Sequence, residues 1–242
     1  MEISVDENVH FQALNRIIRE SKDTDITING VVGQRYIADG LEGKRIVING
    51  VPGNALGAYM NGCEVIVHGN VQEATGDTMN SGKIIVYGSA GDATGYAMRG
   101  GKIYIRDNIG YRAGIHMKAY MDFRPVIVVG GRAGSFLGEY QAGGVIVVLG
   151  QNKDGLPIIN NFCGTGMHGG VIYLRCDSLP RSLPAQVASQ RKWGADIPEL
   201  SELVRDWCNF FPEYNAEQLL AHNFYVLTPN SDNPYKQMYT NN

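Results

Sequence analysis

Nearly the same phrase occurs twice in residues 82–106, GKIIVYGSAGDATGYAMRGGKIYIR. The first copy begins at Gly82 and the second begins nineteen residues later at Gly101. Outward from this stretch, similar apolar triplets recur every 19 or 20 residues, apart from two longer steps of 24 and 26. The triplets are residues 26–28, 46–48, 65–67, 84–86, 103–105, 127–129, 146–148 and 172–174. Such a period indicates a stack of similar units.

A second column of residues follows the same period. Its members, named here the corner glycines, are Gly57, Gly76, Gly95, Gly114, Gly138 and Gly164. The chain has 31 glycines among 242 residues, roughly twice the average usage, and no collagen-like period explains them. We expect each corner glycine where the chain turns back, at positive φ or where the backbone closely approaches the next unit.

The triplets also indicate which side of each strand faces inward. Their first and third residues are almost all β-branched and aliphatic, so we expect Ile84, Val86, Ile103 and Ile105 to point inward. The residues between and after them are mixed, and the opposite face is expected to be wetter. The unit is too short for a propeller blade and lacks the leucine spacing of leucine-rich repeats. The sequence therefore predicts an all-β fold, a parallel β-helix of about eight coils.

The two ends of the chain depart from the repeat, which occupies residues 25–176. Residues 1–24 are predicted to form an N-terminal helical cap, and residues 177–242 a wrapping or capping extension that is partly helical. The apolar face of the first helix consists of Phe11, Leu14, Ile17 and Ile18. A second helix is expected in the C-terminal extension after Pro198, and its apolar face consists of Leu200, Leu203, Val204 and Trp207. Both ends are expected to need a cover, because an open stack exposes apolar interior.

Composition and charge exclude several classes of partner. The net charge is −3, and no run of Lys or Arg would track a phosphate backbone, so we expect neither nucleic acid nor a membrane as partner. No basic and apolar leader begins the chain, and no apolar run is long enough to span a bilayer, which predicts a cytoplasmic protein. Cys63, Cys163, Cys176 and Cys208 form no C-x-x-C pair and are expected to be buried, reduced thiols.

The motifs in the chain predict no catalytic residue, no cofactor site and no metal site. Residues 164–169 match G-x-G-x-x-G, but a strand follows them where a dinucleotide fingerprint requires a helix. Residues 76–83 and 95–102 resemble phosphate loops but lack the spacing that ends in Gly-Lys-Ser/Thr. The histidines are dispersed, and no serine lies in a G-x-S-x-G elbow. The carboxylates near the corners, Asp77, Asp92, Asp107 and Glu139, are expected to be solvated or to form hydrogen bonds within the corners.

Two inserts account for the longer steps. They are HMKAYMDFRP at 116–125 and QNKDGLPIINNF at 151–162. They place Tyr120, Phe123 and Ile158 where the stack does not require them, and we expect these residues to contact another subunit or a second copy of the chain. The alternative is that each insert folds back over its own chain.

Two stretches near the end of the repeat carry a resemblance to a known family. EYQAGGVIVVLG at 139–150, followed by NFCGTGMHGGVIYL at 161–174, resembles the C-terminal GXGXG domain of the glutamate synthase large subunit. One of the subunits of formylmethanofuran dehydrogenase shares the fold of that domain. The resemblance covers roughly residues 25–176 and implies a right-handed β-helix that serves as a scaffold.

The resemblance also implies what the chain does. In glutamate synthase the reacting groups lie in other domains, so no catalytic residue carries over to this chain. It would be a structural subunit or free-standing domain of a glutamate-synthase-like complex, with amidotransferase and FMN-dependent synthase chains, or a copy of itself, as partners. The alternatives are a scaffold in a formylmethanofuran-dehydrogenase-like complex and an independent β-helix protein that acts on or binds carbohydrate.

Overall fold

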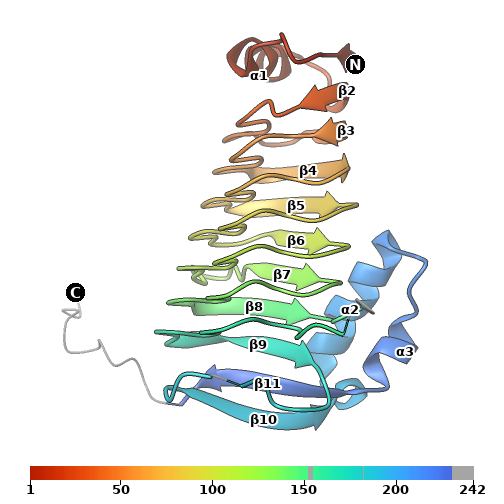
Figure 1. The fold of residues 1–242 in the computed structure, drawn as a ribbon. Coiled ribbons are helices and arrows are strands. Elements are labelled where there is room, and N and C mark those ends of the chain that lie inside the picture. The colour runs from red at the N-terminus through yellow and green to blue at the C-terminus, as the bar shows by residue number, and fades with distance from the viewer. Residues whose placement is uncertain (152–154, 182, 231–242) are drawn as a thin grey trace, which may run out of the picture.

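The computed structural model describes residues 1–151, 155–181 and 183–230. These residues form a mostly β structure with an eleven-stranded sheet in the order β1-β2-β3-β4-β5-β6-β7-β8-β9-β11-β10 (Figure 1). The strands are β1 (Glu2–Ser4), β2 (Asp25–Val32), β3 (Arg45–Val51), β4 (Asn61–His68), β5 (Ser81–Val86), β6 (Lys102–Ile105), β7 (Val126–Val129), β8 (Ala142–Val148), β9 (Gly169–Arg175), β10 (Val187–Trp193) and β11 (Asn223–Pro229). The helices are α1 (Phe11–Glu20), the short 3-10 helix η1 (Gly194–Asp196), α2 (Pro198–Phe210) and α3 (Ala216–Leu220).

The apolar triplets lie side by side in the parallel part of the sheet. All neighbouring pairs from β1 to β9 are parallel. One row of paired residues runs from Ile26 in β2 through Ile84 in β5 to Ile172 in β9. The first and third residues of all eight triplets are buried. The predicted strands and their inward face are therefore confirmed.

Five successive units, those of β4 to β8, have a second, shorter strand position after the main strand. Isolated parallel bridges connect Val71, Ala90, Ile109, Ala133 and Ile159 in succession. All five residues are buried, so this second ladder also lines the core. From the ladder the chain enters the corner and then the next main strand. Figure 1 shows the units one below another, with their turns along one edge.

Left-handed and right-handed backbone alternate in the corners. The six corner glycines all have φ between 65° and 72°. In the corner of Gly95, however, Ala93 (φ 53°) and Ala97 (φ 48°) are left-handed as well. Alanine is thus tolerated at two of the three left-handed positions of this corner. Positive φ alone cannot explain why glycine occupies the middle position.

Space is the second requirement at the corner glycines. A Cβ on Gly95 would lie 2.5 Å from Cδ1 of Ile127, which projects from the second strand that follows. All six corner glycines face a side chain of the second strand that follows, at distances of 2.5 to 2.9 Å. That side chain is a buried isoleucine at the first five and the half-buried Val187 at Gly164. In the first unit the same column holds Ala38, and the matching strand residue is Val65, which has no Cδ1. Because a buried isoleucine in a close-packed core cannot move aside, the corner that faces it needs glycine.

The corner backbone is also tied to its neighbours by hydrogen bonds. The amide of Gly95 donates to the carbonyl of Thr75 in the preceding unit at 2.7 Å. The same bond recurs at all six corner glycines, at 2.7 to 2.8 Å. The corners therefore extend the hydrogen bonding of the sheet around the edge of the stack.

The N-terminal end is covered by a strand and a helix. β1 is a short strand that the sequence did not predict, and it pairs with β2. Helix α1 begins after His10, whose side chain accepts a hydrogen bond from the amide of Gln12. Leu14 and Ile18 are buried, but Ile17 is 47% exposed, so the predicted helical face is wrong at Ile17.

The outward face of the sheet is covered over only part of its length. Over β5 to β9 its side chains are buried beneath α2 and α3 (Figure 1). The predicted apolar face of α2 makes this contact, and Trp207 in that face donates from Nε1 to the carbonyl of Ile105 at 3.0 Å. The expectation of a wetter outward face is therefore wrong here. It holds over β3 and β4, where Asn49 and His68 are exposed.

The parallel run ends at two antiparallel strands. β11 pairs with β9, and β10 pairs with β11, both antiparallel, although η1, α2 and α3 separate β10 from β11 in the chain. Residues 189–193 of β10 are exposed and include Arg191 and Lys192. Charged side chains on an outermost strand disfavour pairing with further strands, so these two strands close this end of the stack.

The packing at the corners predicts that alanine destabilises the protein more at Gly95 than at Gly33, although both glycines have positive φ. Gly95→Ala should destabilise the protein by about 2 to 5 kcal/mol, because the left-handed strain of about 1 to 2 kcal/mol adds to overpacking against Ile127. Gly33 (φ 78°) has no atom within 4 Å of the point where a Cβ would lie, so Gly33→Ala should show only the strain. Urea denaturation followed by circular dichroism measures both.

Ile127→Val supplies the control for this prediction, because it removes the methyl group that Gly95→Ala would meet. The double variant should be more stable than the sum of the two single changes predicts, by about 1 kcal/mol or more. Strict additivity, or equal losses at Gly95 and Gly33, would contradict the role of Ile127.

The covering of the sheet by α2 predicts different roles for the two tryptophans. Trp207→Ala should cost about 3 to 5 kcal/mol, because it removes a fully buried side chain that joins α2 to the sheet. Trp193→Ala should change the stability little, because Trp193 is 44% exposed. Similar melting temperatures for the two variants would show that α2 contributes little to the core.

Candidate functional site

The first insert forms a tight hairpin with exposed apolar side chains. Tyr120 and Phe123 exchange backbone hydrogen bonds of 3.0 and 2.9 Å. Tyr120 is 54% exposed, Phe123 51%, and Met121 between them 80%. Large apolar side chains of this kind are typical anchors of protein contacts. The hairpin, residues 118–125, is therefore the candidate site.

The base of the hairpin is held in place by its neighbours. A Cβ on Gly100 would lie 3.0 Å from Cβ of Phe123. Arg124 forms an ion pair with Glu199 in α2, which also accepts a hydrogen bond of 2.9 Å from the hydroxyl of Tyr173. Burial, and then the nearby Glu199 carboxylate, raises the pKa of Tyr173, so the hydroxyl remains protonated and continues to donate. The structure thus presents the hairpin in a defined position.

The second insert is arranged differently. Ile158 packs against the interior cluster, and a Cβ on Gly150 would lie 2.9 Å from its Cδ1. Ile159, the next residue, belongs to the buried second ladder. This packing favours the alternative for this insert, that it folds back on its own chain. Residues 152–154 of the insert lie outside the described residues.

An aromatic ladder lies on the corners of the last units, and the sequence reasoning missed it. Tyr111, Phe136 and Phe162 have successive ring centroids 5.2 and 4.8 Å apart. His116 stacks on Tyr140 at 5.2 Å. Part of the signal was present in the sequence, because Phe136 and Phe162 lie two residues before their corner glycines, at a position that is alanine in three earlier units. His116 and Tyr140 lie two residues after their corner glycines, whereas Tyr111 lies three residues before Gly114, outside both columns.

Two residues of the ladder have a strained backbone, and the arginine that packs on it is paired with a carboxylate. Phe136 and Phe162 have φ of 61° and 63°, conformations that bulky residues rarely adopt. The guanidinium of Arg112 lies over Phe136 and donates to the carboxylate of Glu139 at 3.0 Å. The rings of Tyr111, Phe136 and Phe162 are tilted from one to the next by 59° and 31°, whereas those of His116 and Tyr140 are stacked. Each ring pair contributes about 0.5 to 1.5 kcal/mol, which offsets part of the strain.

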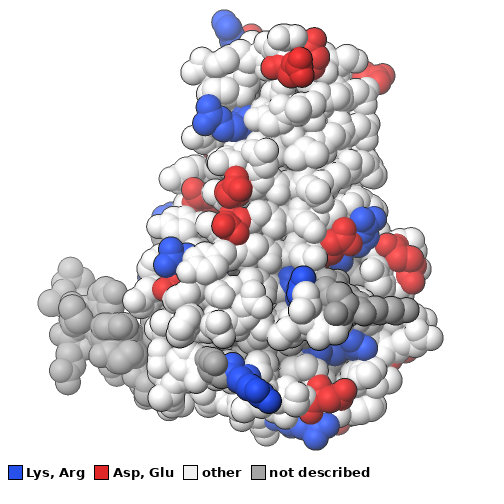
Figure 2. All heavy atoms as spheres, in the orientation of Figure 1, with Lys and Arg blue, Asp and Glu red and all other residues white. Residues whose placement is uncertain are grey.

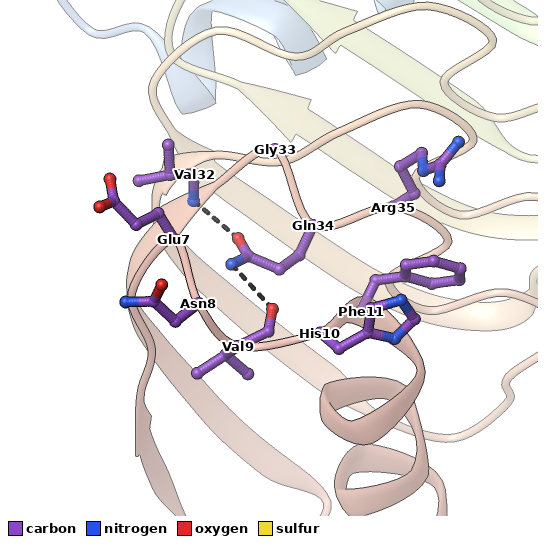
Figure 3. A pocket seen from close by; sticks show the side chains of 9 residues that line it. All are labelled: Glu7, Asn8, Val9, His10, Phe11, Val32, Gly33, Gln34 and Arg35. Atoms are coloured by element: carbon purple, nitrogen blue, oxygen red, sulfur yellow. Dashed lines mark hydrogen bonds between the residues drawn. The ribbon is translucent and has the colours of Figure 1, made fainter.

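A small hollow near the N-terminus serves the fold. Figure 3 shows it between residues 7–11 and residues 32–35. Gln34 accepts a hydrogen bond from the amide of Val32 and donates to the carbonyls of Asp6 and Val9. Gln34 is 4% exposed, and these three hydrogen bonds tie the N-terminal segment to the stack. We assign no ligand to this hollow.

The thiols are not activated. Burial raises the pKa of the Cys163 thiol to about 12 and those of Cys176 and Cys208 to about 11. Cys63 and Cys163 are buried, whereas Cys176 and Cys208 are only half-buried, which corrects the expectation for those two. Within the described ranges, no group of three His, Cys, Asp or Glu side chains is placed to hold a metal ion.

Two carboxylates of α2 fasten the helix to the sheet. Asp206 accepts hydrogen bonds from Lys102 at 2.7 Å and from the hydroxyl of Tyr104 at 3.1 Å. Burial alone would raise the pKa of Asp206, but the bond to Lys102 and its charge outweigh that effect and lower it. Glu199 holds Arg124 and Tyr173 in a similar way. Both carboxylates are thus occupied in structural contacts.

Charge is spread thinly over the surface. Figure 2 shows small groups of both signs on one face, separated by uncharged surface. Every helix in the part of the chain that the structure describes is too short or too polar to cross a lipid bilayer.

Comparisons with known proteins found a relative in sequence and a likeness in fold. An uncharacterized protein of Methanocaldococcus jannaschii is 42% identical, over 99% of this chain and 97% of its own length. A chain of the formyltransferase/hydrolase complex of Methylorubrum extorquens, solved in complex with methylofuran, superposes with a TM-score of 0.62. That chain is 20% identical, and the match covers 85% of this chain and 74% of that one, so it shows a likeness in fold.

The family model described as the GXGXG motif matches residues 2–230. This match extends the resemblance, which the sequence placed at about residues 25–176, over nearly the whole chain. The predicted family is therefore confirmed, and the chain belongs to the GXGXG motif family.

Proposed function

We propose that the chain is a non-catalytic scaffold subunit of a cytoplasmic enzyme complex. The observation that carries the proposal is the hairpin of residues 118–125. Its three exposed apolar side chains, Tyr120, Met121 and Phe123, lie on a fixed base and add nothing to the core of their own chain. Burying one such anchor in a partner contributes about 2 kcal/mol or more.

In this proposal the repeat is a right-handed parallel β-helix. The parallel strands in chain order, the second ladder and the bonded corners support it. Parallel connections are right-handed in nearly all proteins. The proposed domains are the N-terminal cap of residues 1–24, the β-helix of residues 25–176 and the C-terminal extension of residues 177–242.

Two kinds of complex are supported about equally. The motifs at 139–150 and 161–174 favour a glutamate-synthase-like assembly with amidotransferase and FMN-dependent synthase chains. The likeness in fold to a chain of a formyltransferase/hydrolase complex favours an assembly of the formylmethanofuran dehydrogenase type. A carbohydrate-binding β-helix has less support, because neighbouring rings of the aromatic ladder pack against each other, with centroids 4.8 to 5.2 Å apart, and cover part of the faces that a sugar would need.

Two observations support the non-catalytic part of the proposal. The pKa values of the thiols are raised, and the carboxylates of Asp206 and Glu199 are occupied in structural hydrogen bonds. Any reaction of the complex would take place on other chains. In this role the stack holds those chains at a set distance, because strand spacing fixes its length at roughly 4.8 Å per unit.

Affinity purification from the native host tests the partner contact. Tagged wild-type protein should carry stoichiometric amounts of its partner, and Tyr120→Asp with Phe123→Asp should reduce that amount about tenfold or more, since two buried anchors are replaced by charges. Tyr59→Asp is the matched control, because Tyr59 is equally exposed, at 56%, on an early corner.

Mass spectrometry of the co-purified chains then decides between the two complexes. Amidotransferase and synthase chains support the first, and formyltransferase, hydrolase or dehydrogenase chains support the second. If the double variant retains its partner, or if wild type elutes as a partnerless monomer, the proposed contact fails.

A further inference from the structure

A cavity of about 860 Å³ lies where three segments distant in sequence meet. Residues 155–161 of the second insert, the end of β9 with the loop that follows it, and the residue before β11 provide its described walls. Its volume falls in the range of small-molecule sites, which is roughly 300 to 1,000 Å³. This cavity is separate from the hairpin of residues 118–125, so a ligand bound in it would be independent of the proposed scaffold role.

The lining of the cavity combines an apolar part with a few cationic groups. The apolar part consists of Leu156, Pro157, Ile158, Ile159, Leu179 and Pro180. Among the described lining residues, the cationic groups are Arg175 and Arg181, and the other polar groups include the imidazole of His222 and the carboxylate of Asp177. Ligand pockets are typically apolar with a small number of placed polar groups, and this lining has that character.

Arg175 is the key residue of the cavity. Its Nη1 donates to the carbonyl of Leu149 at 3.0 Å, while its Nε is buried and has no hydrogen-bond partner. Among the described residues, no carboxylate lies within ion-pair distance of its guanidinium. Burial lowers the pKa of Arg175, with the charge of Asp177 opposing that effect. A half-buried cation without a counter-ion costs stability unless an anion accompanies it.

Arg175 also lies between two cavities. A second one, of about 280 Å³, has Arg175, His222 and Tyr214 in its walls. The side chain of Arg175 therefore borders both cavities. Cys176, which also lines the larger cavity, has a pKa raised to about 11 and is not a nucleophile at neutral pH. The chemistry that remains is non-covalent binding.

We propose that the larger cavity binds a small organic anion, with an apolar body against Leu179 and Ile158 and one carboxylate or phosphate group at Arg175. A guanidinium matches either head group with parallel hydrogen bonds. The apolar wall selects against an inorganic ion, which has no body to bury there.

Fluorescence titration of the full chain with 8-anilinonaphthalene-1-sulfonate tests the proposal, because this probe joins an apolar body to one anionic group. Wild type should bind it saturably, and Arg175→Met should weaken binding about tenfold or more. Arg191→Met is the matched control, because Arg191 is an exposed arginine on β10, and it should leave the affinity unchanged. Equal affinity in wild type and Arg175→Met would overturn the proposal.

Competition by hexanoate and by hexyl phosphate identifies the head group, since the one that displaces the probe at lower concentration is preferred. If neither displaces it, the probe is held by apolar contacts alone and the proposal is wrong. Arg175→Met also removes the bond to Leu149, so Leu179→Asp provides a second variant at the 43% exposed rim. It should repel the probe with the melting temperature preserved, and unchanged binding in it would contradict the site even if Arg175→Met unfolds.

Discussion

At six corners of the stack, a glycine amide donates to a carbonyl of the preceding unit, and a side chain of a later strand fills the space where a Cβ would lie. Both contacts occur at all six corner glycines, from Gly57 to Gly164. The first fixes the spacing between units, and the second lets the interior rows pack without a gap. The strand register, the second ladder and the core between them are all compatible with this one arrangement.

The covering of the sheet divides the molecule into two parts. Over β5 to β9 the outward face is buried by α2, with Trp207 and the two carboxylates Glu199 and Asp206 joining helix to sheet. Over β3 and β4 the same face is open. The hairpin, the aromatic ladder and the large cavity all belong to the later units. Features that could contact other molecules are thus concentrated near one end of the stack.

Much of the fold could be predicted from the sequence, because the repeat places equivalent residues in equivalent surroundings. The triplets such as Ile84–Val86 and the glycine column followed from spacing alone. Other features depend on contacts that spacing does not encode. The outward face looked wetter because Tyr104 and Tyr173 are amphipathic, and only the packing of α2 shows that they are buried. β1 is too short to leave a pattern.

The candidate site was predictable only in part. The insert that carries Tyr120 and Phe123 was visible as a break in the period, and the exposure of these side chains required the structure. The cavity around Arg175 was not visible, because its walls come from segments about 20 to 60 residues apart.

The central claim is that the corners are bonded as firmly as the strands, which native-state amide hydrogen exchange measures residue by residue. The account predicts that the amides of the corner glycines exchange as slowly as that of Ile84, whereas exchange as fast as that of Met121 at the hairpin tip would contradict it.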